Sequence, residues 1–113
     1  MTTGEGFTGE GLLTAGPRPR AVLALSGELD FAAAGEAYKQ LIACDLPAGA
    51  ELVLDLSRLT FMDSYGIRLI LQAGERARRH GAALVVVRPP AQVLRVLELV
   101  GLDEQLDLVE SRN

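Results

Sequence analysis

Short apolar runs alternate with segments of helical spacing along this chain. Three runs, at residues 21–25, 52–56 and 83–87, have the length and the Val, Leu and Ala content of buried strands. The run at 83–87 is almost continuously apolar, which is typical of a strand covered on both faces in a parallel sheet. A last short strand is expected at residues 106–109, and residues 12–13 could pair with the first run in a hairpin.

Between these runs, apolar positions recur every three or four residues and predict three helices. Asp30 is placed to cap the first helix, which ends before Pro47. The second helix ends at Gly81, and the third runs from Pro90 to Gly101. The expected buried positions are Ala34, Ala37, Tyr38, Leu41 and Ile42 in the first helix, Ile67, Ile70, Leu71, Gly74 and Ala77 in the second, and Val93, Leu94, Val96, Leu97 and Val100 in the third.

This order of elements predicts an α/β fold. Strands that alternate with helices are joined by crossover connections, which make neighbouring strands parallel. We therefore expect a mixed, mostly parallel sheet of four or five strands with helices packed on it. Residues 12–113 would form this single domain, and residues 1–11, rich in Gly and Thr, would form a flexible N-terminal segment.

Composition narrows the classes of function. The 113 residues include 49% hydrophobic ones, enough for one domain with a modest core. The net charge of −4 and the absence of Trp argue against nucleic acid as a direct partner. Cys44 is the only cysteine, so we expect no internal disulfide, no structural metal and a cytoplasmic protein. Neither a targeting signal nor a membrane span is expected from the distribution of apolar residues.

Two strand-to-helix turns carry acidic residues. The first, Gly-Glu-Leu-Asp, spans residues 27–30, and the second, Phe-Met-Asp-Ser-Tyr-Gly, spans residues 61–66. Right-handed crossovers place such turns at one edge of the sheet, where α/β folds present their functional groups. If the two strands are neighbours, Asp30, Asp63 and Ser64 face one small patch.

Three interpretations of Ser64 compete. Asp63 or Ser64 can cap the helix, since a side-chain oxygen at its start accepts from a free backbone N–H. Ser64 could instead be a hydrolase nucleophile, but Met62 stands where such a turn has its first Gly. In addition His80, the only histidine, would lie roughly 24 Å along the same helix, too far to take the proton. The third interpretation is that Ser64 accepts a phosphoryl group.

The phosphoacceptor interpretation comes from a family resemblance. The stretch LVLDLSRLTFMDSYGIRLIL, residues 52–71, resembles the signature of STAS domains that act as anti-sigma factor antagonists. The GELD of residues 27–30 is similar to a second family motif, and PPAQVLRVLELVGLDEQL, residues 89–106, to the family's third helix and its ending. Three motifs in the same order cover the chain from about residue 21 onward.

The resemblance implies a STAS fold and a regulator that is not an enzyme and needs no cofactor. In its unphosphorylated state it would bind a cognate anti-sigma factor, itself a serine kinase, and so release a sigma factor in a bacterial cytoplasm. Phosphorylation of Ser64 would switch it off, and a PP2C-type phosphatase would reset it. The alternative is a STAS interaction or scaffold module, or a transport accessory, that phosphorylation does not regulate.

The resemblance also implies roles for the neighbours of Ser64. Asp63 would fix the turn, and Asp30 would present Ser64 or contact the kinase. Tyr65 departs from the small residue common after the acceptor, so it could select a partner or obstruct one. Gly66 could allow a partner to approach closely or could serve helix-to-sheet packing. The expected partner-binding residues are Glu28, Asp30, Asp63, Tyr65 and Gly66.

Overall fold

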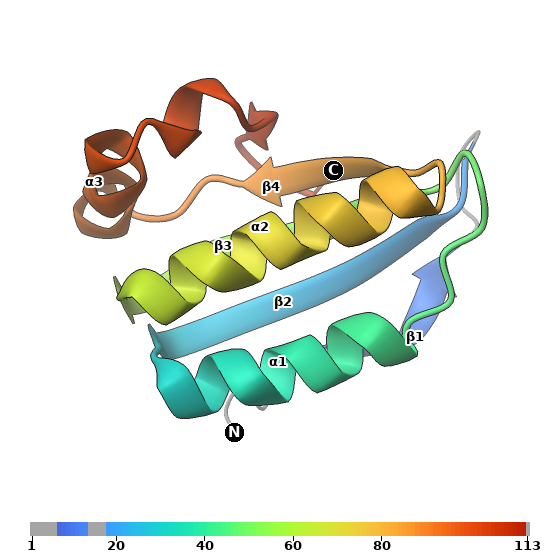
Figure 1. Cartoon of the computed structure of the whole chain (residues 1–113), viewed down its shortest axis with the longest axis horizontal. Coiled ribbons are helices and arrows are strands. Elements are labelled where there is room, and N and C mark those ends of the chain that lie inside the picture. Colours follow the sequence, from blue (N-terminus) through green and yellow to red (C-terminus); the bar gives the residue numbers. More distant parts are fainter. Residues whose placement is uncertain (1–6, 14–17, 113) are drawn as a thin grey trace.

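The computed structural model describes residues 7–13 and 18–112 of the chain (Figure 1). The strands are β1 (Phe7–Leu13), β2 (Arg20–Leu29), β3 (Glu51–Met62), β4 (Ala83–Val87) and β5 (Leu108–Val109). The helices are α1 (Phe31–Ala43), α2 (Ser64–Arg79) and α3 (Ala91–Leu99), followed by a 3₁₀ turn, η1 (Leu102–Glu104). Strands and helices therefore alternate in the predicted order.

All five strands form one sheet in the order β1-β2-β3-β4-β5. β1 is antiparallel to β2, whereas β2, β3, β4 and β5 pair in parallel. The predicted mixed, mostly parallel α/β sheet is thus confirmed, including the hairpin with β2. The first strand begins at Phe7 rather than at residue 12, so pairing starts inside the segment expected to be flexible; residues 1–6 lie outside the described part of the chain.

β2 and β3 are longer than the apolar pattern predicts. β3 continues beyond residue 56 to Met62, past exposed positions that break the run of apolar residues. The register with β2 shifts twice, because one extra residue of β3 lies between the partners of Ala24 and Ser26 and another between those of Gly27 and Glu28. With these two extra residues in β3, Leu29 at the end of β2 is in register with Met62 at the end of β3.

The main core lies between the sheet and its helices. On β3, Leu52, Leu54 and Leu56 point into this core, and Val53 and Asp55 alternate onto the opposite face. Figure 1 shows α1 and α2 side by side on one face of the sheet, both running in the same direction. Buried residues of α3 contribute to the same core.

Four helix positions predicted to be buried lie on the surface instead. Tyr38, Ile42, Leu71 and Val100 are exposed by 39%, 48%, 55% and 52%. Helical spacing places these positions beside the buried ones, but it does not separate the two sets. The buried positions of α2 that the pattern missed are Gly66, Leu69 and Ala73.

An ion pair between Asp55 and Arg112 lies on the opposite face of the sheet. Asp55, buried beside Val53, accepts hydrogen bonds from the backbone N–H (3.0 Å) and hydroxyl (2.7 Å) of Ser57 and from Nε of Arg112 (2.6 Å). Burial alone would raise the pKa of Asp55, but the hydrogen bonds from Ser57 and Arg112 outweigh it and hold the pKa below its ordinary value. This pair fixes the C-terminal residues against β3.

We expect Asp55 to contribute to the stability of the fold in a pH-dependent manner. Because its folded pKa is depressed, its stabilisation is present above the unfolded value of about 3.9 and is lost as the pH falls through the folded value. Asp55→Asn should lower the free energy of unfolding at pH 7 by about 1–3 kcal/mol. It should also flatten the loss of stability at acidic pH in urea titrations. Parallel pH profiles of the two proteins would contradict this account.

Candidate functional site

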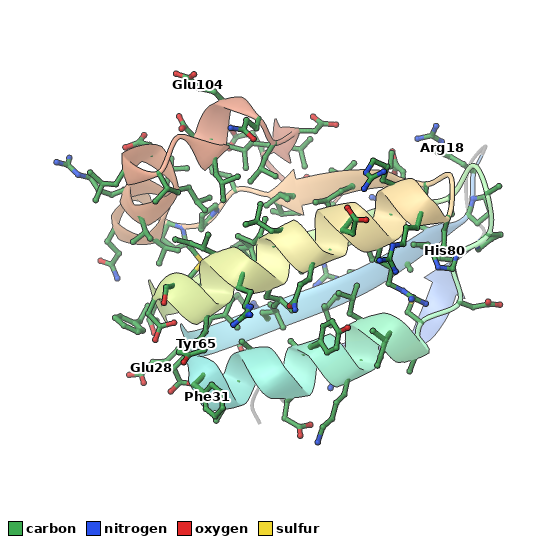
Figure 2. All side chains as sticks on the ribbon, viewed as in Figure 1. Arg18, Glu28, Phe31, Tyr65, His80 and Glu104 are labelled. Carbon is green, nitrogen blue, oxygen red and sulfur yellow. The ribbon has the colours of Figure 1, made fainter. Side chains whose placement is uncertain are left out.

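The two acidic turns lie next to each other at one edge of the sheet. Leu29 at the end of β2 is in register with Met62 at the end of β3, and the backbone N–H of Asp63 donates to the carbonyl of Leu29 (3.5 Å). Figure 2 shows Glu28, Phe31 and Tyr65 gathered at this end, where α1 and α2 begin. The predicted juxtaposition of Asp30, Asp63 and Ser64 thus follows from parallel pairing. We call this region the Ser64 edge: Glu28, Asp30, Phe31, Asp63, Ser64 and Tyr65.

Each acidic turn contains an aspartate that caps a helix. A carboxylate oxygen of Asp30 accepts from the backbone N–H of Ala33 at 3.1 Å, at the start of α1. A carboxylate oxygen of Asp63 accepts from the backbone N–H of Tyr65 at 2.9 Å, at the start of α2. Both aspartates have extended backbone angles, as N-cap residues do.

Asp63, rather than Ser64, is therefore the capping residue. Ser64 is the first residue of α2 and is exposed. In the described part of the chain no hydrogen bond is made by its hydroxyl group, which stays available for another role. It lies at the end of the helix where free N–H groups and the helix dipole favour negative charge.

The Tyr65 ring packs against Phe31. The two ring centroids are 4.9 Å apart with planes inclined by 70°, an edge-to-face contact between the first turns of α1 and α2. Tyr65 is 40% exposed and Phe31 68% exposed. Phe31 was not singled out from the sequence, because only the pairing of β2 with β3 brings the two rings together.

Gly66 is buried where α2 crosses the ends of the strands. A Cβ atom added there would lie 2.2 Å from Cγ of Met62 and 3.1 Å from Cδ2 of Leu29. Because real Cβ atoms do not approach so closely, packing against Met62 accounts for the glycine. Direct contact between Gly66 and a partner stays a prediction.

A cationic side chain lies one helical turn beyond Ser64. Arg68 lines, with Ser64, Tyr65, Ile67 and Leu71, a shallow hollow of about 380 Å³. Residues at i and i+4 of a helix are surface neighbours, so the guanidinium lies within reach of a group attached to Ser64. The i+4 spacing was the signal in the sequence that could have identified Arg68.

The only histidine of the chain lies far from Ser64. His80 follows the last residue of α2, at the far end of the helix from Tyr65 (Figure 2). Over the described ranges, no cluster of His, Cys, Asp and Glu could hold a metal ion.

Cys44 is buried, and burial raises the pKa of its thiol. Among the described residues, no helix has the length and hydropathy needed to cross a membrane.

Comparison with known proteins identifies relatives over most of the chain. A family model described as "Mlab, STAS domain" matches residues 13–110. The anti-sigma-B factor antagonist of Listeria monocytogenes is 27% identical over 89 residues, which cover 79% of this chain and 75% of the relative. The anti-sigma-B factor antagonist of Listeria innocua matches equally well.

Similar folds occur in solved structures that are also named anti-sigma factor antagonists. The anti-sigma factor antagonist SpoIIAA in its unphosphorylated form has a TM-score of 0.68 with 21% identity, over 88% of this chain and 87% of that one. An anti-sigma factor antagonist from Mycobacterium paratuberculosis has a TM-score of 0.65 with 27% identity, over 89% of this chain and 86% of that one. The names of both structures, like those of the two Listeria relatives, describe anti-sigma factor antagonists.

We expect Gly66→Ala to destabilise the protein by about 1–3 kcal/mol, because its Cβ would overlap Met62. Gly74→Ala is the matched control in α2, since its Cβ would meet Leu84 at an ordinary 3.7 Å. That variant should be neutral or stabilised by up to about 1 kcal/mol through helix propensity. Urea unfolding measures both, and similar effects of the two substitutions would contradict the packing role of Gly66.

Substitutions of Asp63 can separate its capping role from its charge. Asp63→Ala should lower the free energy of unfolding by about 1 kcal/mol, because the N–H of Tyr65 loses its acceptor. Asp63→Asn keeps an acceptor oxygen and should cost only a few tenths of a kcal/mol, as caps of these two types are nearly equivalent. Thermal unfolding of the two variants tests this prediction. If both variants lose the same stability, the loss does not come from the missing cap.

Proposed function

The chain belongs to the STAS domain family, and from this we propose that it is an anti-sigma factor antagonist that phosphorylation of Ser64 switches off. In its unphosphorylated state it binds an anti-sigma factor that is a serine kinase, and so releases a sigma factor. The observation that carries the proposal is the exposed hydroxyl of Ser64 at the start of α2, directly after the capping carboxylate of Asp63. The names of its relatives in sequence support the same class of function.

A phosphate on Ser64 is compatible with the fold. It lies at the N-terminus of α2, where the helix dipole and free N–H groups favour an anion by about 0.3–2 kcal/mol. Arg68, one turn further along, offers a guanidinium that suits phosphate oxygens. The capping bond from Tyr65 to Asp63 does not involve the Ser64 hydroxyl, so the helix keeps its start after modification.

The same phosphate changes the surface that a partner meets. Two negative charges about 6 Å from a carboxylate, in an effective dielectric near 40, are repelled by roughly 2–3 kcal/mol. That energy corresponds to a loss of affinity of about 30- to 150-fold. A partner that places a carboxylate or nucleotide phosphates over the Ser64 edge is therefore released.

The remaining residues of the Ser64 edge are its contact surface. Glu28 and Asp30 flank the acceptor from the neighbouring turn, and the rings of Phe31 and Tyr65 present an apolar patch beside it. Aromatic side chains of this kind dominate the energetics of many interfaces. A kinase would transfer the terminal phosphoryl group of ATP to Ser64, and a PP2C-type phosphatase would remove it in the cytoplasm of a bacterium.

Ser64→Ala and Ser64→Glu test the switch directly. Ser64→Ala should bind the anti-sigma factor kinase of the source organism as tightly as the unmodified chain. Ser64→Glu adds one negative charge at the site and should bind about tenfold more weakly. Isothermal titration calorimetry with the purified kinase gives both affinities.

Ser111→Glu is the control, because it adds the same charge to an exposed serine of the C-terminal segment. It should bind like the unmodified chain. If Ser64→Glu binds as well as Ser64→Ala, charge at this position does not control the partner. The chain would then act as an interaction module that phosphorylation does not regulate.

A further inference from the structure

A groove lies between α1 and α2. It starts beside the Ser64 edge and extends along the two helices toward His80. It has a volume of about 350 Å³, and its lining includes Tyr38 and Ile42 from α1 and Arg68, Leu71, Arg76 and Arg79 from α2. In Figure 2 the two helices lie side by side from Phe31 and Tyr65 at one end to His80 at the other. We call this surface the α1–α2 groove.

The apolar side chains of the groove are those that the hydrophobic pattern assigned to the core. Tyr38, Ile42 and Leu71 are 39%, 48% and 55% exposed, although each shares a helix with buried neighbours. All three line the α1–α2 groove. A concave apolar surface is the common feature of grooves that accept an amphipathic helix.

The groove is also basic, although the chain as a whole carries a net charge of −4. Arg68, Arg76 and Arg79 line it together with a single carboxylate, that of Glu75. Glu75 is already paired with Arg78 and, at 3.2 Å, with Arg79. Arg76 also donates to the carbonyl of Cys44 at 3.0 Å. The lining therefore carries more positive than negative charge, and the arginines all come from α2.

The groove is continuous with the Ser64 edge. Arg68 and Leu71 line both the α1–α2 groove and the hollow beside Ser64. A third hollow, of about 190 Å³, joins Tyr38 and Arg68 of the groove to the Phe31–Tyr65 pair. One partner can therefore cover the acceptor and the groove at the same time.

We propose that the α1–α2 groove docks an acidic amphipathic helix of the anti-sigma factor whose kinase site acts on Ser64. This docking proposal rests on the function proposed above. It adds a second contact surface for the same partner, beside the Ser64 edge. Leu or Ile side chains of that helix fill the floor between Tyr38, Ile42 and Leu71, and its Asp or Glu side chains face the arginines. α1 has 13 residues and is about 20 Å long, so three to four turns of a partner helix fit.

The position of Arg68 links docking to phosphorylation. Arg68 lines both the groove and the hollow beside Ser64. A phosphate on Ser64 would compete there with the carboxylates of the partner helix, because both need the same cation. Phosphorylation would then weaken the groove contact as well as the contact at the Ser64 edge.

Charge reversal at the far end of the groove tests the proposal. Arg79→Glu alters an exposed groove residue roughly 22 Å along the axis of α2 from Ser64. Arg78→Glu is the matched control, because Arg78 also pairs with Glu75 and is equally exposed, but is not part of the lining. Ile42→Glu in the groove is matched in the same way by Leu99→Glu, an exposed residue of α3.

The groove variants should bind the anti-sigma factor kinase at least about tenfold more weakly, and the controls within about twofold of the unmodified chain. In phosphorylation assays the groove variants should raise KM and leave kcat unchanged, since the distance to Ser64 leaves the acceptor in place. Circular dichroism establishes that all four variants are folded.

Several outcomes would contradict the docking of a partner helix in the α1–α2 groove. If Arg79→Glu and Ile42→Glu bind like their controls while Ser64→Glu still weakens binding, the docking proposal is wrong. The proposed switch at Ser64 then still holds. If the unmodified chain does not bind the kinase, both proposals fail. Binding to vesicles of phosphatidylcholine and phosphatidylglycerol that is lost in the groove variants would assign the surface to an anionic membrane instead.

Discussion

The parallel pairing of β2 with β3 is the interaction on which the candidate site depends. It puts Leu29 beside Met62, so that the two strands end together and their aspartates cap two neighbouring helices. Because side chains alternate along a strand, a slip of one residue would turn Leu52, Leu54 and Leu56 away from the core. Burial of these leucine side chains thus fixes the register of the two strands. That register in turn determines the geometry of the site.

In the second turn, the residues that stabilise the fold lie next to the proposed acceptor, Ser64. Met62 and Gly66 belong to the core, where the missing Cβ of Gly66 lets α2 lie on the sheet. Asp63 accepts from the N–H of Tyr65 at the start of α2, and among the described residues no hydrogen bond involves the Ser64 hydroxyl. Modification of Ser64 can therefore change the surface without a cost to the fold, a requirement of any reversible switch.

The features that the sequence predicts are those set by local chemistry. Asp30 could be identified as a cap, and the second cap could be narrowed to Asp63 or Ser64, because a cap depends on its own residue and the next three. Contacts between distant segments could not be identified: Asp55 pairs with Arg112, and Phe31 meets Tyr65, only after the strands are assembled. Helical spacing gives the direction of a side chain but not the space available to it. For that reason the pattern placed Ile42 in the core, whereas it lines a groove.

Intact-mass analysis after incubation with the anti-sigma factor kinase and ATP tests the central claim most directly. The account predicts that the unmodified chain gains one phosphoryl group, that peptide fragmentation locates it on Ser64, and that Ser64→Ala gains none. A chain that gains no mass, or one that is modified at a different residue while Ser64 stays free, would contradict it.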